Sequence, residues 1–235
     1  MHFTARIAVR WTALALASIA LVWSGSLAAG RLTNATTVQA AEPKPIQLPK
    51  PQTTGGMPLM QALSARKTTR AFQDKPLPLQ TLSNLLWAAF GVNRSSMESH
   101  MPGGKPQPGR TAPSAMNRQE IELYVVLADG IYVYDAVQNQ LRPVAAGDMR
   151  SKIGAPPAEH AAVTIVYVGP ANNSFEQVDT GFIGQNVYLF AASEGLNAWL
   201  YAMHGPQETA AVAATLNLGA DRVPLYGQSV GYPPQ

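Results

Sequence analysis

The stretch Ala161–Val168 carries no charged side chain, and it constrains the fold more than any other part of this chain. An apolar run of this length, rich in β-branched residues, is typical of a strand, and the absence of charge indicates a strand at the centre of a sheet. Ile121–Leu127 is a second apolar run. Asp129-Gly130 and the alternating residues Ile131–Tyr134 follow it, which predicts a β-hairpin.

Four segments show the apolar spacing of amphipathic helices. They are Met57–Arg66, a segment from Pro78 or Thr81 to Gly91, Asp179–Gly195 and Pro206–Leu216. Two further strands are expected at Asn197–Met203 and Val223–Tyr232. Asn93–Pro113 is rich in Gly, Pro and Ser and is predicted to be a long loop, either functional or disordered. Strands and helices in this order predict an α+β fold with helices packed against a sheet.

The first forty residues have the features of a secretory signal peptide. Arg6 and Arg10 form a positive start, an uncharged and mostly apolar run follows, and Val38–Ala40 fits a small-x-small cleavage site. An uncleaved membrane anchor is the alternative, although Ser24–Ser26 interrupts the apolar stretch that a spanning helix of about 20 residues needs. We therefore expect an exported, periplasmic or extracellular protein. Its expected parts are a signal peptide at 1–40, a Pro-rich linker at 41–56 and one domain at 57–235.

Charge and composition argue against several classes of protein. Three of the seventeen basic residues lie in the first forty, so the remainder has fourteen basic and fourteen acidic residues and lacks the surplus typical of nucleic-acid binding. The chain has no Cys, hence no disulfide and no thiolate metal site. His100, His160 and His204 do not show the spacing of metal ligands. Ser114 lies in no Gly-x-Ser-x-Gly hydrolase motif.

Three polar segments contain residue types that suit a phosphorylated cofactor. The first, from Arg66 to Arg70, joins cations and hydroxyl groups directly after a helix, as a phosphate requires. The second, Pro113–Asn117, ends in an amide that has both donors and an acceptor. The third, Ile183–Gln185, lies near the expected start of a helix, where glycine permits close approach and backbone N–H groups are unpaired.

Each of these segments also has a purely structural interpretation. The basic segment has the composition of a solvated turn. Pro113–Asn117 has the composition of a capping loop before a strand. Asp179, at the start of the expected helix, is a good N-cap residue.

In this order, the three segments resemble the flavin-binding elements of the nitroreductase family, over roughly residues 57–233. Leu85–Val92 and Gln185–Ala192 are similar to the dehydrogenase-like branch, which includes the azoline-oxidising enzymes. The resemblance implies a mostly antiparallel central sheet with helices on both sides. It also implies FMN bound between two copies of the chain, a small-molecule or peptide substrate, and hydride transfer through the flavin by a ping-pong mechanism.

The resemblance assigns cofactor contacts but no catalytic side chain. Arg66 and Thr68 match positions at the phosphate and ribityl chain, and Arg70 matches a position toward the pyrimidine edge. Pro113–Asn117 would come from the second copy of the chain. The cofactor-binding residues implied are Arg66, Lys67, Thr68, Arg70, Pro113, Ser114, Asn117, Ile183, Gly184 and Gln185.

The chain departs from the family pattern at two places. Glu120 stands where a Pro is expected after Gln119. The Lys or Arg pair expected beyond the final strand is missing, so that either fewer cations hold the phosphate or a substitute serves. The candidate substitutes are Arg110, Arg118 and Arg222. The alternative function is therefore a non-catalytic or weakly flavin-binding accessory protein of the cell envelope.

Overall fold

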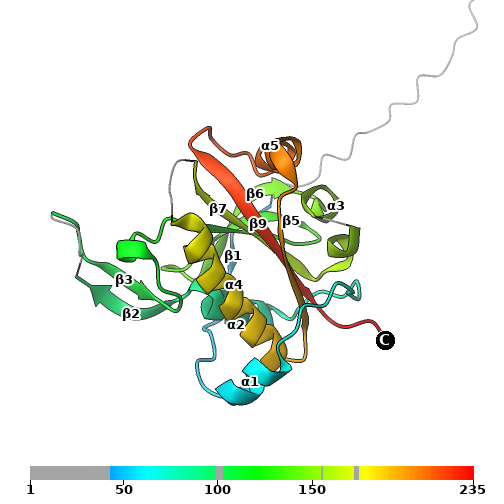
Figure 1. The fold of residues 1–235 in the computed structure, drawn as a ribbon, viewed down its shortest axis with the longest axis horizontal. Coiled ribbons are helices and arrows are strands. Elements are labelled where there is room, and N and C mark those ends of the chain that lie inside the picture. The colour runs from blue at the N-terminus through cyan, green and yellow to red at the C-terminus, as the bar shows by residue number, and fades with distance from the viewer. Residues whose placement is uncertain (1–42, 99–102, 155, 172–174) are drawn as a thin grey trace, which may run out of the picture. The chain divides into compact units, whose positions relative to one another are not determined.

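The computed structural model describes residues 43–98, 103–154, 156–171 and 175–235. Within these residues a seven-stranded sheet forms the centre, and every pair of neighbouring strands is antiparallel (Figure 1). In sheet order its strands are β1 (Ile46–Gln47), β6 (Gln140–Ala146), β5 (Gly130–Asp135), β4 (Glu122–Val126), β7 (Val163–Pro170), β9 (Arg222–Gly231) and β8 (Asn197–Ala202). The charge-free strand β7 lies between β4 and β9, so the predicted central strand is confirmed, as is the β4–β5 hairpin.

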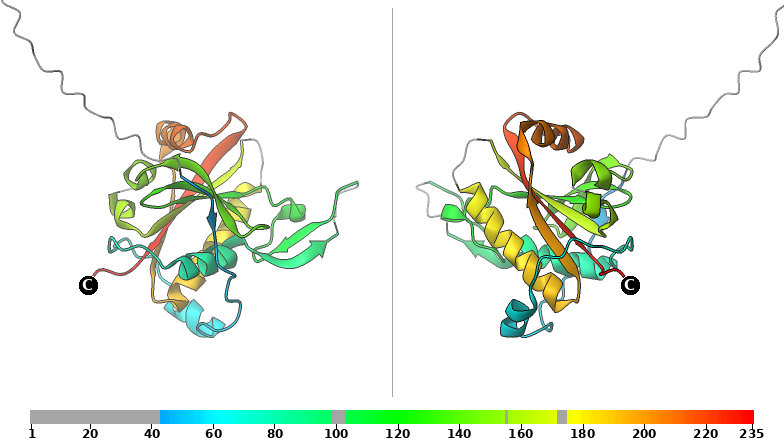
Figure 2. Two further views of the ribbon diagram at one scale, coloured as in Figure 1. Left: turned by 180° about the vertical axis from the view of Figure 1, so that it is seen from behind. Right: turned by 45° about the vertical axis from the view of Figure 1, so that its right-hand side comes forward.

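Helices cover both faces of the sheet (Figure 2). They are α1 (Leu59–Ala65), α2 (Leu79–Phe90), α3 (Arg150–Ile153), α4 (Glu176–Ser193) and α5 (Gly205–Thr215). Alternate strand residues face opposite sides. Leu123 of β4 and Ile165 of β7 therefore pack in the core with α2 and α4, whereas Val126 and Val166 pack with α3 and α5. The expected architecture, a mostly antiparallel sheet between helices, is confirmed.

Helix α4 ends where the sequence predicts but starts earlier. Gly195 has a left-handed φ of +68°, and the N–H of Leu196 donates to the carbonyl of Ala191 at 2.8 Å, which is the Schellman ending. The N-terminal cap is Phe175 rather than Asp179. Asp179 therefore lies inside the helix, and its interpretation as an N-cap is wrong.

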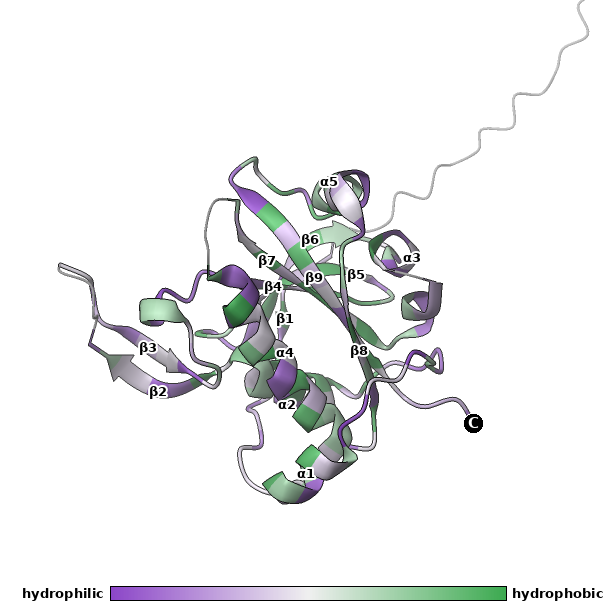
Figure 3. Cartoon of the chain, viewed as in Figure 1, coloured by the Kyte–Doolittle hydropathy of each residue, from purple (hydrophilic) through white to green (hydrophobic). Residues whose placement is uncertain are grey.

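The prediction of a long loop at Asn93–Pro113 is wrong, because this segment contains two paired strands. β2 (Val92–Met97) and β3 (Gln107–Arg110) form a separate antiparallel hairpin with irregular register. Figure 3 shows polar colours over much of this hairpin. Most of β2 is exposed, so its residues lack the apolar alternation by which strands are recognised in a sequence.

The segment assigned to a linker is extended, and its described residues lie against the domain. Ile46 pairs with Leu141 of β6, and Leu48 is buried in the core shared with α2 and α4. β6 itself was not expected from the sequence; it contains Pro143 and little periodic pattern. In the part of the chain that the structure describes, no helix is both long and apolar enough to cross a membrane. The predicted signal peptide, 1–40, lies outside the described residues.

Candidate functional site

The basic loop, defined as Arg66–Arg70, leaves α1 and runs along the edge of the sheet. Arg66 is the C-cap of α1, and its N–H donates to the carbonyl of Ala62 at 2.9 Å. The N–H of Thr69 donates to the carbonyl of Ala198 in β8 at 2.9 Å. Because β8 is the last strand of the sheet, this bond uses part of its free edge and holds the loop beside it.

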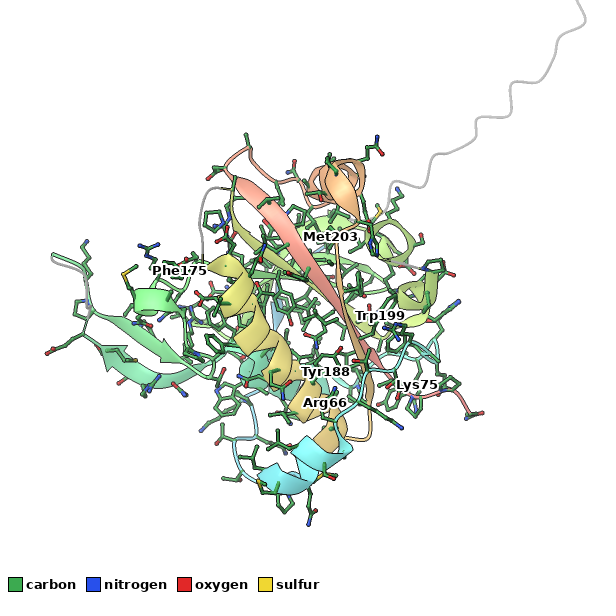
Figure 4. The ribbon with its side chains drawn as sticks, viewed as in Figure 1. Arg66, Lys75, Phe175, Tyr188, Trp199 and Met203 are labelled. Atoms are coloured by element: carbon green, nitrogen blue, oxygen red, sulfur yellow. The ribbon has the colours of Figure 1, made fainter. Side chains whose placement is uncertain are left out.

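Tyr188 of α4 joins the basic loop to the sheet. Its hydroxyl lies 3.0 Å from Oγ1 of Thr68 and accepts the N–H of Leu200 at 2.9 Å. The guanidinium carbon of Arg66 lies 5.5 Å from the centre of the Tyr188 ring, within the range of a cation–π contact. Figure 4 shows Arg66 and Tyr188 next to each other where the loop passes α4. The phenol thus sets the position of two predicted phosphate residues relative to β8.

The cations of the basic loop have no acidic partner in the part of the chain that the structure describes. Across the described ranges, neither Arg66, Lys67 nor Arg70 forms an ion pair with a carboxylate. Arg70 stands over the ring of Trp199 at 5.5 Å, and Lys67 lines a cavity of about 350 Å³ between the loop, α4 and β8. Uncompensated cations beside hydroxyl groups suit a phosphate dianion.

Asp179 holds the Pro113–Asn117 segment against α4. Its two carboxylate oxygens accept the N–H of Ala115 at 3.0 and 3.1 Å, and the residue is only 1% exposed. Burial raises the pKa of Asp179 above its usual value, while the Ala115 hydrogen bond opposes that rise. This acidic side chain therefore places the segment on the helix that also carries Tyr188.

A polar network shapes the chain from Ser114 to Gln119. The N–H of Gln119 donates to Oγ of Ser114 at 3.0 Å, but the Ser114 side chain makes no capping hydrogen bond to the short helical turn Ala115–Asn117 that follows it. Met116, Asn117 and Gln119 all have positive φ, which non-glycine residues rarely adopt. The Nδ2 atom of Asn117 is buried and has no hydrogen-bond acceptor among the described residues. Strained backbone and an unpaired buried donor at one place are typical of binding sites.

The third predicted segment, Ile183–Gln185, does not lie at a helix start, because α4 begins at Glu176. Its backbone N–H groups are inside the helical hydrogen-bond ladder, so the argument from unpaired groups is wrong. Ile183 is fully buried in the core, and a Cβ on Gly184 would come within 2.6 Å of Leu200 Cδ1. Ile183 and Gly184 therefore pack the helix onto the sheet, and only Gln185 is exposed.

The model of the nitroreductase family matches residues 63–232. This chain belongs to the nitroreductase family. A Ralstonia eutropha protein of known crystal structure that bears the name nitroreductase is 36% identical, with a TM-score of 0.71 over 82% of this chain and 91% of that chain. A nitroreductase structure from Anabaena variabilis shares the fold, with a TM-score of 0.60 and 17% identity over 75% of this chain and 38% of that one.

One named relative from an archaeon is also similar. A Methanocaldococcus jannaschii protein that bears the name nitroreductase is 29% identical over 161 residues, 59% of this chain and 75% of that protein. Family and relatives together support an oxidoreductase of the flavin type. These similarities do not distinguish the azoline-oxidising branch from the rest of the family, so the assignment to that branch stays a prediction.

Within one copy of this nitroreductase-family chain, the two predicted cofactor segments contact different parts of α4. Tyr188 contacts the basic loop and Asp179 contacts Pro113–Asn117. These two helix positions are nine residues apart, about 14 Å at 1.5 Å per residue. Figure 4 shows Phe175, which caps the start of α4, far along the helix from Arg66. Each segment is assembled locally, but a single copy does not bring the two segments into contact.

The proposed substitute cations are engaged elsewhere. Arg222 pairs with Glu122 at 2.8 Å, and Arg110 donates to Gln119 at 2.7 Å. Arg118 stands over the ring of Phe175 at 5.9 Å. None of these contacts involves the basic loop, so the structure gives no support for the substitution.

Other candidate chemistry is sparse in the described residues. No group of three or more His, Asp or Glu there is placed to hold a metal ion. His160 lies 3.4 Å from Glu159, and the backbone N–H of His204 donates to Glu208. His100 lies outside the described residues.

Reasoning from the sequence did not identify Tyr188 as a site residue. A tyrosine on the inner side of a helix needs a hydrogen-bond partner for its hydroxyl, and this requirement could have indicated that Tyr188 contacts another segment. The partners, Thr68 and Leu200, are distant in sequence and could not be named from it.

Proposed function

We propose that this protein is an FMN-dependent oxidoreductase that transfers hydride through the flavin by a ping-pong mechanism. The basic loop carries the proposal: Arg66, Lys67 and Arg70 are cationic and lack acidic partners within the described ranges. Thr68 is held beside them by Tyr188. Membership of the nitroreductase family supports the same chemistry.

The residues present fit the parts of FMN. The cations of the basic loop would bind the phosphate, with the hydroxyl of Thr68 as an additional donor. The pyrimidine edge of the ring offers carbonyl acceptors, and the buried Nδ2 of Asn117 is a donor without an acceptor among the described residues. When bound, the flavin supplies the hydride chemistry, while the chain binds and orients it.

We also propose that the protein is a homodimer in which each site takes one segment from each copy. The basic loop and Pro113–Asn117 do not meet within one copy, so a complete site requires a second chain. Phe175, Val178 and Phe182 lie three and four residues apart on α4 and are 40%, 54% and 44% exposed. An apolar stripe of this kind is typical of a protein–protein interface.

The proposed location is outside the cytoplasm, after cleavage near Ala40. The support is the positive start, the apolar run and the small-residue site in residues 1–40. N-terminal sequencing of the protein recovered from the secreting host tests this proposal. A mature form that retains Met1 would show an uncleaved anchor instead.

Purification of the full chain without added flavin tests the proposed cofactor. We expect a yellow protein that releases FMN on denaturation, identified by its absorption and mass, at about one FMN per chain. A colourless protein that also fails to bind added FMN in a titration would contradict the proposal. That result would favour the accessory protein of the cell envelope.

A further inference from the structure

A chain of hydrogen-bonded side chains, called the relay below, ends in the Pro113–Asn117 segment. Its members are Arg110, Gln119 and Asn117. Nε of Arg110, at the end of β3, donates to Oε1 of Gln119 at 2.7 Å. Nε2 of Gln119 then donates to the carbonyl of Pro108 at 2.6 Å and to Oδ1 of Asn117 at 2.9 Å. Three side chains from two segments thus share one line of donors and acceptors.

Arg110 fixes the direction of this relay. A guanidinium has donors only, so Gln119 must turn its oxygen toward Arg110 and its NH₂ group away. That NH₂ group meets Oδ1 of Asn117, which obliges Asn117 to turn its own NH₂ group to the other side. Arg110 is itself held by the carbonyl of Phe90 at 3.3 Å and stands 5.1 Å from the Phe90 ring. Because an arginine keeps its proton at physiological pH, the direction does not reverse.

Asn117 is the last residue of the relay, and the described residues offer no acceptor for its side-chain donor. Its backbone carbonyl accepts a hydrogen bond from Nε2 of Gln107, and its φ of +52° lies in the left-handed region that asparagine tolerates. Nδ2 is buried and has no acceptor among the described residues. Native proteins rarely leave a buried N–H group unpaired, so a bound molecule is the expected acceptor.

We infer that Arg110 and Gln119 are positioning residues, which hold Asn117 so that its Nδ2 donates to an acceptor atom of the ligand. The ligand class is a heteroaromatic imide or a similar ring carbonyl. The inference rests on the proposed function, in which the pyrimidine carbonyls of the flavin are the acceptors. Neither positioning residue has to touch the ligand, because each acts on Asn117.

The decisive variant is Gln119→Glu in the full chain. The new carboxylate still pairs with Arg110 but has no N–H for Oδ1 of Asn117, so the Asn117 amide turns to donate Nδ2 back into the relay. We expect the dissociation constant of FMN to rise about tenfold, as it should in Asn117→Asp, where the donor is removed directly. Asn117→Ala removes the donor without adding a second carboxylate. In that background Gln119→Glu should cause no further loss of affinity, because the relay and the donor act as a unit. Gln138→Glu makes the same charge change at an exposed position and serves as control.

A second readout uses the flavin-free protein and ¹⁵N-labelled side-chain amides. The NH₂ signals of Asn117 should shift downfield in Gln119→Glu, since they then donate to a carboxylate. Thermal stability should fall, because the carbonyl of Pro108 also loses its donor. Wild-type FMN affinity in Gln119→Glu, or a further loss of affinity in the Asn117→Ala background, would overturn the relay. If the wild type binds no FMN, the proposed function fails, and the amide signals still decide the orientation of Asn117.

Discussion

The hydroxyl of Tyr188 lies 3.0 Å from Oγ1 of Thr68, and through this contact helix α4 holds the basic loop against the sheet. The same oxygen accepts the N–H of Leu200 at the free edge of β8. One phenol therefore connects the loop, the helix and the strand. Its removal should affect both the stability of the protein and the proposed phosphate site.

Tyr188→Phe should lower the free energy of unfolding by about 1–3 kcal/mol, because the N–H of Leu200 is left without its acceptor. FMN affinity should fall as well, since Thr68 loses the contact that places it. Urea unfolding and FMN titration measure the two effects. Tyr124→Phe, at a tyrosine on the opposite face of the sheet, is the control. Equal behaviour of the two variants would show that the Tyr188 hydroxyl contributes nothing.

Arg66→Ala should weaken FMN binding by roughly one to two orders of magnitude. A charge-assisted hydrogen bond contributes about 1.5–3 kcal/mol, and about 1.4 kcal/mol corresponds to a factor of ten. Fluorescence titration with FMN measures the change, and Lys152→Ala on α3 removes one exposed cation as a control. Unchanged affinity in Arg66→Ala would mean that the basic loop is not the phosphate site.

Asp179 should make stability depend on pH in a defined direction. Burial raises its pKa in the folded protein, so the folded state holds a proton that the unfolded chain, with a pKa of about 3.9, releases. Its contribution to stability is therefore greatest at acidic pH and declines as pH rises from about 4 through the raised folded pKa. In Asp179→Asn this decline of the free energy of unfolding with rising pH should be absent. Urea unfolding at several pH values measures it. If the free energy of unfolding changed with pH in the same way in the wild type and in Asp179→Asn, the prediction would be contradicted.

Gly184→Val should lower stability by about 1–3 kcal/mol, the usual cost of overpacking a core. A Cβ at this position would lie 2.6 Å from Leu200 Cδ1, where α4 meets β8. Gly181, three residues earlier on the same helix, has no atom within 4 Å of an added Cβ. Gly181→Ala should therefore be tolerated, and thermal unfolding compares the two. A tolerated valine at position 184 would show that α4 can move away from the sheet.

Phe182→Asp should convert the proposed dimer into monomers, because it places a charge in the exposed apolar stripe of α4. Sedimentation velocity at micromolar concentration measures the change. Glu194→Gln, near the other end of α4, is a surface control. A wild-type protein that sediments as a monomer would refute the proposed assembly, with or without the substitution.

Local sequence patterns were sufficient for most of the fold. The absence of charge in Ala161–Val168 identified the central strand, and apolar spacing with Gly195 located α4 and its end. Strands without an apolar face, such as β2, escaped prediction, because nothing in their composition separates them from a loop. The basic loop could also be recognised from the sequence, because its cations and hydroxyl groups are adjacent in the chain.

Only the tertiary structure decided how these residues are used. It placed Thr68 on Tyr188 and Ala115 on Asp179, pairs that are 120 and 64 residues apart in sequence. It also put Ile183 and Gly184 into the core, because both lie on the face of α4 that packs against the sheet. Propensity and periodicity act over a few neighbouring residues, whereas hydrogen bonds between distant segments depend on packing. The sequence by itself therefore determined most of the elements and the family, and the packing of α4 on the sheet decided which side chains meet.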